Sequence, residues 1–219
     1  MNSHKKYVVF DAYGTLFKVN GNLKNLTEQQ SILSEKVQAL WRSRQLEYTW
    51  LCNSMGVWMD FNQITYNALD YALQYYGVEN DESFRSALLG IYKTPTTFSD
   101  VIPFLENLKA QGIATAILSN GTIAQIEASV KTAQIEKNLV DDIFSVSAVE
   151  LFKPSPKVYQ MVIDHYQCKA EEVAFFSSNA WDICGASRFG FYTTWVNRKN
   201  EPFEVLGIEP DLVVNAFSR

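Results

Sequence analysis

The chain has 219 residues, of which 47% are hydrophobic and 20% charged, and its formal net charge is −5. This composition excludes wholesale disorder and is typical of one folded domain with a modest insertion. The acidic balance argues against a nucleic-acid-binding surface, and no apolar run reaches the roughly 18 residues of a membrane span. The apolar run at residues 7–10 is too short for the core of a signal peptide, so we expect a soluble, cytoplasmic protein.

Cysteine and histidine usage excludes further classes of site. Cys52, Cys168 and Cys184 are odd in number and far apart, a pattern typical of reduced thiols in a reducing compartment. Histidine occurs at positions 4 and 165, too few for a His-ligated metal centre, and a Ser-His-Asp triad would have to use one of these two. Any chemistry therefore falls to carboxylate, Lys, Arg, Ser and Asn side chains.

Short apolar runs alternate with helical patterns along most of the chain. The runs that predict buried strands are residues 7–10, 113–118, 143–146, 173–176, 191–196 and 212–214. The helices expected between them are residues 100–111, 122–132, 155–166 and 180–189. This alternation predicts right-handed βαβ units and an α/β fold with a Rossmann-like, doubly wound parallel sheet.

Residues 18–97 interrupt the alternation. They show helical periodicity with many aromatic side chains and no convincing strand, and helix breaks are expected at Gly56, Gly77 and Gly90. We interpret this stretch as an all-helical cap subdomain inserted after the first strand. The core domain then comprises residues 1–17 and 98–219.

Polar clusters follow the predicted strands where ligands bind in open α/β sheets. They are Asp11 to Thr15, Ser119-Asn120, the turn around Lys153, and Ser177 to Asp182. Taken singly, each has an ordinary explanation: Asp11 could cap a turn, Ser119-Asn120 a helix, and Lys153 could be a solvated surface residue. Their joint occurrence at successive strand ends favours one site.

The segment Phe10-Asp11-Ala12-Tyr13-Gly14-Thr15-Leu16-Phe17 resembles the first motif of the haloacid dehalogenase superfamily, in which the Asp is the nucleophile. Leu118-Ser119-Asn120 is similar to the second motif, and Lys153 in Phe152-Lys153-Pro154 to the third. The fourth matches Ser177 to Asp182. The resemblance implies the HAD-like fold.

Two departures separate the chain from the phosphatases of that superfamily. Tyr13 stands where they have a second Asp, and the fourth motif offers Ser177, Ser178 and Asn179 where they have metal-binding carboxylates. Mg²⁺ requires oxygen ligands, commonly including carboxylates, so most of its site is lost. A Mg²⁺-dependent phosphatase of a small phosphorylated metabolite remains the alternative function, and a catalytically silent binding protein is a third.

The closest pattern is that of the L-2-haloacid dehalogenase family, which shares Asp-x-Tyr-Gly-Thr-Leu-Phe and the Ser177–Asp182 stretch. Within the cap, Leu40 to Tyr48 also resembles the family sequence, with Arg42 as the cap's contribution to the site; Ser43 departs from the usual Gln. The resemblance implies hydrolysis of short-chain L-2-haloacids to D-2-hydroxy acids. We accordingly expect an ester to form on Asp11 with inversion at C2, and no metal or organic cofactor to take part.

The residues suit this first step. Asp11 is the nucleophile, Lys153 keeps it ionised, and Thr15 holds it in line. Ser119 and the following backbone N–H groups suit the substrate carboxylate. The Arg42 guanidinium suits the departing halide. The family resemblance implies that Asn120 and Trp181 also bind the halide.

The second step and the pocket complete the prediction. Asp182 either activates the water that hydrolyses the ester or is the counter-ion of Lys153, with Ser177 and Asn179 positioning the water or Asp182. Tyr159 either joins this network or packs in the core. The apolar pocket is expected to use Tyr13, Leu46, Phe61 and Trp181. The aromatic cap helices predict a homodimer, although the same stripes could form internal core.

Overall fold

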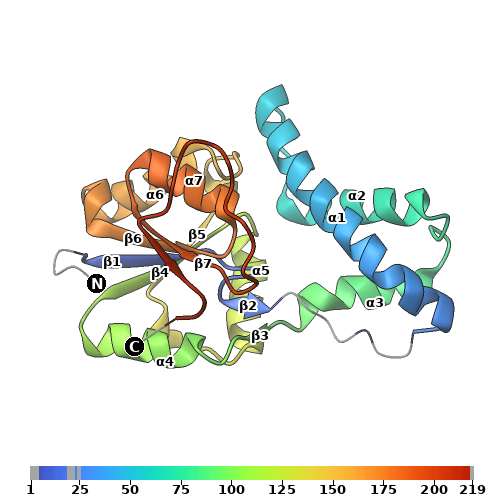
Figure 1. Ribbon diagram of the computed structural model, residues 1–219, viewed down its shortest axis with the longest axis horizontal. Helices are drawn as coiled ribbons and strands as arrows, with labels where there is room; N and C mark the ends of the chain where they lie inside the picture. Colours follow the sequence, from blue (N-terminus) through green and yellow to red (C-terminus); the bar gives the residue numbers. More distant parts are fainter. Residues whose placement is uncertain (1–4, 19–22, 24–25, 218–219) are drawn as a thin grey trace.

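The computed structural model describes residues 5–18, 23 and 26–217, which form a parallel sheet with helices on both faces and a separate group of three helices (Figure 1). The sheet has six strands in the order β5-β4-β1-β6-β7-β8. Their bounds are β1 Tyr7–Phe10, β4 Ala114–Ser119, β5 Asp142–Ser145, β6 Val173–Ser177, β7 Tyr192–Val196 and β8 Leu212–Val214. The predicted α/β class and doubly wound sheet are confirmed.

Alternation along the central strand explains why both faces of the sheet are covered. Val8 and Phe10 belong to an apolar cluster with α4 and α5, whereas Val9 faces a second cluster with α6 and α7. In Figure 1, α6 and α7 lie on one side of the sheet and α4 on the other. These helices are α4 Val101–Ala110, α5 Ile123–Thr132, α6 Pro156–Tyr166 and α7 Ala180–Phe189; the short 3₁₀ helices are η1 Lys137–Leu139, η2 Val146–Ala148 and η3 Ala170–Glu172.

Strand β1 lies between β4 and β6, and this order brings together polar residues that are distant in the sequence. Phe10 is in register with Ile117 of β4 and Phe176 of β6. Because the strands are parallel, the segments that follow β1, β4 and β6 emerge at one edge of the sheet. This is the crevice at a topological switch point where ligands bind in such folds.

The separate helical group consists of α1 Glu28–Met55, α2 Phe61–Tyr75 and α3 Glu82–Lys93. A capping box of Thr27 and Gln30 begins α1, and Gly56 ends it with φ +65°. The three helices share a core of their own, which includes Val37, Trp41, Ala68, Leu69, Leu73, Phe84 and Leu88. No helix in the described ranges has the length and apolar composition needed to cross a bilayer.

Two local expectations were wrong. Gly90 lies inside α3 and does not break it, because Leu88 and Ile91 on either side are buried in the helical core. The stretch expected to lack strands carries two short ones, β2 Phe17–Lys18 and β3 Thr96–Thr97, which pair antiparallel. Two-residue strands leave no period in a sequence, so only the pairing itself identifies them.

Candidate active site

Asp11 directly follows β1, and three donors hold its carboxylate. Thr15 Oγ1 and Asn179 Nδ2 each donate to Oδ2 at 2.9 Å, and Lys153 Nζ donates to Oδ1 at 3.2 Å. The turn that returns Thr15 to Asp11 passes through Gly14 at φ +89°, a conformation that favours glycine. The Asp11 side chain is 10% exposed, so its charge is both compensated and fixed in direction.

Lys153 connects Asp11 to a second carboxylate. Its ammonium lies 2.8 Å from Asp182 Oδ2, and Asp182 Oδ1 accepts a hydrogen bond from Tyr159 OH at 2.8 Å. Lys153 precedes α6, Tyr159 lies on α6, and Asp182 lies in the first turn of α7; all three are fully buried. A continuous chain of polar contacts therefore runs from the Tyr159 phenol to Asp11.

Burial and neighbouring charges shift the pKa values of Asp182, Lys153 and Tyr159. Burial raises the pKa of Asp182 to about 6, although Lys153 opposes the shift. Burial alone would lower the pKa of Lys153, but the carboxylates of Asp182 and Asp11 outweigh it and the net direction is upward. Burial and the neighbouring Asp182 raise the pKa of Tyr159 well above its ordinary value. Near neutral pH, Lys153 is a cation and Tyr159 a hydrogen-bond donor.

Ser119 is the last residue of the neighbouring strand, β4, and Asn120, which follows it, contacts Lys153. Asn120 Oδ1 accepts from the backbone N–H of Lys153 at 3.0 Å, and Ser119 Oγ accepts from the backbone N–H of Gly121 at 3.1 Å. Helix α5 begins at Ile123, so its positive N-terminal end lies close to this pair. The arrangement suits an anion beside Asp11.

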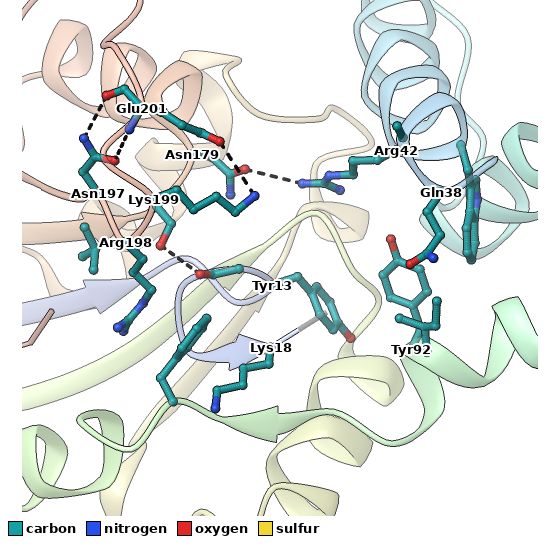
Figure 2. A pocket seen from close by; sticks show the side chains of 17 residues that line it. Tyr13, Lys18, Gln38, Arg42, Tyr92, Asn179, Asn197, Arg198, Lys199 and Glu201 are labelled. Atoms are coloured by element: carbon teal, nitrogen blue, oxygen red, sulfur yellow. Dashed lines mark hydrogen bonds and ion pairs between the residues drawn. The ribbon is translucent and has the colours of Figure 1, made fainter. Parts of the chain in front are cut away.

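Arg42 reaches the site from α1, in the helical group. Its Nη1 group donates to Gln45 Oε1 at 2.7 Å. Its Nη2 group lies 3.5 Å from Asn179 Oδ1, a contact drawn in Figure 2. Asn179 thus contacts both Asp11 and Arg42. A carboxylate from the sheet and a guanidinium from the helices therefore share one amide neighbour.

A small cavity of about 20 Å³ lies among these side chains. This volume is close to that of one water molecule, so a larger ligand requires side chains or helices to move apart. Its walls are Asp11, Tyr13, Arg42, Leu46, Phe61, Ser119, Asn120, Lys153, Asn179 and Trp181.

This geometry combines a carboxylate held by three donors with two cations in the wall of one cavity, Lys153 and Arg42, an arrangement that suits substitution with an anionic leaving group. Residues 5–190 also match the family model of haloacid dehalogenase-like hydrolases. The chain belongs to that family. The predicted HAD-like fold of this hydrolase is thereby confirmed.

Comparison with individual proteins assigns the hydrolase to a narrower family. (S)-2-Haloacid dehalogenase 1 of Pseudomonas sp. (strain CBS-3) is 41% identical over 196 residues, which are 90% of this chain and 86% of the relative. (S)-2-Haloacid dehalogenase of Pseudomonas sp. (strain YL) is 38% identical over 212 residues, 97% of this chain and 91% of the relative. The solved structure of L-2-haloacid dehalogenase from Xanthobacter autotrophicus with chloropropionic acid covalently bound has a TM-score of 0.84 at 35% identity, covering 97% and 95% of the two chains. The predicted membership of the L-2-haloacid dehalogenase family is confirmed.

The structure brings the predicted site residues of the hydrolase to one place. The predicted substrate-binding side chains all line the small cavity: Tyr13, Arg42, Leu46, Phe61, Ser119, Asn120 and Trp181. Three predicted catalytic residues line it as well: Asp11, Lys153 and Asn179. The other predicted residues do not line the cavity but contact a lining residue or one another: Thr15, Tyr159, Ser177 and Asp182.

Ser177 and Asn179 were expected to position a water molecule or Asp182, and these roles stay predictions. The Asn179 side chain bonds Asp11 and Arg42, and its carbonyl accepts from the backbone N–H of Asp182 at 3.0 Å. Ser177 Oγ accepts from the backbone N–H of Asn179 at 3.1 Å. Asn179 lies at the N-cap of α7, one turn before Asp182, so its side chain leaves the helix toward β1.

The residues of this hydrolase do not fit a Mg²⁺ site. The Tyr13 hydroxyl bonds Ser129 Oγ at 3.0 Å, away from the carboxylates. Between Asp11 and Asp182 lies the Lys153 ammonium, which repels a divalent cation and already uses one oxygen of each carboxylate. Within the described ranges, no group of three or more His, Cys, Asp or Glu side chains is arranged to hold a metal.

A larger cavity of about 580 Å³ adjoins the small one and shares Tyr13, Arg42 and Asn179 with it (Figure 2). Its lining includes Lys18, Arg198 and Lys199 as cations and Glu201 as the one acidic side chain among its lining residues. Cations outnumber anions here although the whole chain is acidic. Arg198 pairs with Asp100 at 2.9 Å and Lys199 with Glu201 at 3.8 Å, so part of this positive charge is already balanced.

Two supporting residues were not predicted from the sequence. Ser178 donates its backbone N–H to Thr15 Oγ1 at 2.8 Å and its hydroxyl to the Gly14 carbonyl at 2.9 Å, which ties the loop after β6 to the nucleophile loop. Gln45 contacts Arg42 from inside the helical group. Ser178 lies in a recognised motif, and the spacing of Gln45 three residues after Arg42 was a signal available in the sequence.

Proposed function

We propose that this hydrolase converts short-chain L-2-haloacids to D-2-hydroxy acids by hydrolytic dehalogenation. The observation that carries the proposal is the small cavity in which the Asp11 carboxylate and the Arg42 guanidinium are both lining groups. The kinship with (S)-2-haloacid dehalogenases supports the same substrate class. The reaction is proposed to need no cofactor.

In the first step, a carboxylate oxygen of Asp11 attacks C2 of the substrate from the side opposite the halogen. A C–O bond forms, the C–halogen bond breaks with its electron pair, and C2 inverts. The bonds from Thr15 and Asn179 to Oδ2 and from Lys153 to Oδ1 hold the nucleophile in a single direction. Preorganisation of this kind removes reorientation from the barrier.

The substrate carboxylate is proposed to bind at the end of β4, beside the Ser119 hydroxyl. The departing halide is proposed to bind Arg42, the Asn120 amide and Trp181. Asn120 directs its oxygen to Lys153 N, which leaves its N–H groups free for an anion in the cavity. Leu46 and Phe61 would surround the alkyl group and exclude water from the first step.

In the second step, water attacks the ester carbonyl carbon of Asp11. The bond from that carbon to the ester oxygen breaks, the hydroxy acid takes up a proton, and the water oxygen stays in Asp11. Both carboxylate oxygens of Asp182 are engaged, one by Lys153 and one by Tyr159. This geometry supports Asp182 as the counter-ion of Lys153 more than as the base, and the base role remains a prediction for the pH experiment below.

The proposed reaction gives the helical group the role of a cap. Residues 18–97 would form it, and residues 1–17 and 98–219 the core. Asn53 on α1 supports this division, because its side chain makes two hydrogen bonds, of 2.8 and 2.9 Å, with the backbone of Phe152 in the core. Movement of the cap about this contact would open the small cavity to the larger one.

The test is halide release from L- and D-2-chloropropionate in the presence of EDTA. Chloride should appear from the L enantiomer alone, with the D-hydroxy acid as product, and Asp11→Asn should lower the rate at least about 10³-fold. A single turnover in ¹⁸O-labelled water should place the label in Asp11 and not in the product. Release that survives Asp11→Asn, or that requires Mg²⁺, would contradict the proposal.

A homodimer and a cytoplasmic location are proposed as well. Leu51 and Met55 lie one turn apart on α1, 44% and 64% exposed, and form an apolar stripe suited to a second copy. Three unpaired cysteines suit a reducing compartment. Light scattering should give a dimer mass that Met55→Glu lowers, and cell fractionation should recover activity in the cytoplasm; a monomeric wild type would refute the dimer.

A further inference from the structure

The Arg42 guanidinium has two contacts of unequal length, and the shorter one sets its orientation. The bond to Gln45 Oε1 is 2.7 Å, whereas the contact with Asn179 across to the core is 3.5 Å. The short contact therefore comes from α1 itself, three residues further along the same helix. An arginine side chain has several freely rotating bonds, so a single short partner decides where its charge lies.

The Gln45 amide is itself held in one orientation. Gln45 is fully buried, and its Nε2 donates to Thr65 Oγ1 on α2 at 2.7 Å. The Thr65 hydroxyl carries one hydrogen and donates it to the Phe61 carbonyl at 2.6 Å, so toward Gln45 it can act only as an acceptor. The amide nitrogen must face Thr65, and the amide oxygen must face Arg42.

The amide oxygen has a second donor in this orientation. Tyr92 OH on α3 donates to Gln45 Oε1 at 3.4 Å. Burial raises the pKa of Tyr92, which keeps the phenol protonated. All three helices of the group thus contribute to the position of one amide oxygen.

We propose that Gln45 is a positioning residue that directs the Arg42 guanidinium at the leaving halide, with Thr65 fixing its amide. The inference rests on the proposed dehalogenation. It follows from the geometry because Gln45 touches the guanidinium and does not line the small cavity, so Arg42 is its contact among the residues that do. A guanidinium that is misdirected by about 1 Å loses much of its effect on the transition state.

The test compares chloride with bromide as leaving groups. Chloride departs less readily than bromide and depends more on the guanidinium. Misdirection of Arg42 should therefore lower the dehalogenation rate of L-2-chloropropionate more than that of L-2-bromopropionate. The quantity to measure is kcat/KM, because it covers the steps through halide departure and omits ester hydrolysis. Substitution of a residue with a purely structural role would lower kcat/KM for both substrates by the same factor.

Gln45→Met keeps the length of the side chain and removes its three hydrogen bonds, to Arg42, Thr65 and Tyr92. We expect kcat/KM for the chloride substrate to fall about 10- to 100-fold and for bromide several-fold less. Thr65→Val removes only the hydroxyl that orients the Gln45 amide. For this variant kcat/KM for the chloride substrate should fall about 3- to 10-fold, and the chloride-to-bromide ratio of kcat/KM should fall as it does in Gln45→Met. Gln74→Met, on an exposed part of α2, is the matched control and should change neither rate.

An unchanged chloride-to-bromide ratio in folded Gln45→Met would overturn the assignment. If thermal unfolding shows that Gln45→Met does not fold, Thr65→Val decides by the same ratio. Failure of the dehalogenation proposal is distinguishable, because the wild type would then release no halide from either substrate. A loss confined to the variants concerns Gln45 alone.

Discussion

The Lys153 ammonium lies 2.8 Å from Oδ2 of Asp182, and neither side chain is more than 1% exposed. The same ammonium also contacts Asp11, so one buried cation serves two carboxylates. Breaking such a group by removing one partner leaves uncompensated charge away from water. Stability and catalysis should therefore depend on the same three side chains.

Replacing Lys153 by Met should destabilise the fold in a pH-dependent way. At pH 7.5 the variant should lose about 3–5 kcal/mol of unfolding free energy, because two buried carboxylates remain without a cation. The pKa of Asp182 is already raised to about 6, and without Lys153 it rises further. Asp182 then binds a proton on folding, so the loss should shrink as pH falls toward 5.

Urea unfolding of wild type and Lys153→Met at both pH values measures this difference. Lys157→Met, exposed on α6, is the matched control and should leave stability within about 0.5 kcal/mol of wild type. An equal loss at both pH values would show that the cost comes from lost packing and not from charge.

The pH dependence of catalysis should report Asp182. Because burial raises its pKa to about 6, the carboxylate form predominates above that value, and the rate constant of ester hydrolysis, measured in a single turnover, should fall tenfold per pH unit below it. Asp182→Asn should be slow and lack this acid limb between about pH 5 and 8. Asp164→Asn, on the exposed side of α6, should retain it. An acid limb near the ordinary carboxylate value would contradict the assignment.

Tyr159→Phe should move the same limb to higher pH. The phenol donates to Asp182 Oδ1 at 2.8 Å, and a hydrogen bond to the charged form lowers the pKa of that carboxylate. Phe keeps the ring packed against Phe175, Phe189 and Phe191. Unfolding free energy should fall by about 1.5–3 kcal/mol, and pH profiles beside an exposed control, Tyr75→Phe, test the shift.

Gly185 allows α7 to approach the loop before α6. A Cβ at this position would lie 2.5 Å from both Tyr159 OH and Pro154 Cβ, so Gly185→Ala should cost about 1–3 kcal/mol and reduce activity by displacing Tyr159 from Asp182. Adding Tyr159→Phe should recover part of the stability. Gly90→Ala is the control: its Cβ meets nothing within 4 Å, and thermal unfolding should show a gain of about 0.5–1 kcal/mol. A neutral Gly185→Ala would mean that the two elements separate freely.

Much of the fold could be predicted because its signals are local. Apolar runs bounded by polar residues identified the strands of the large sheet, and the motif residues after β1, β4 and β6 were placed at one edge by the direction of parallel strands. The helix break expected at Gly90 was wrong because the helix there depends on packing with distant residues and not on a local signal. The cost of a glycine within a helix, about 1 kcal/mol, is exceeded by burial of its neighbours, which depends on the rest of the helical group.

By itself, the sequence determined the sheet, the inserted helices and which residue types stand at the site. The tertiary structure decided which of those side chains face one another: Asn179 toward Asp11, Tyr159 toward Asp182, and Gln45 between Arg42 and Thr65. Those pairings join residues up to 168 positions apart. Motifs record residue types at strand ends, whereas hydrogen-bond geometry is set by how helices from distant parts of the chain pack together.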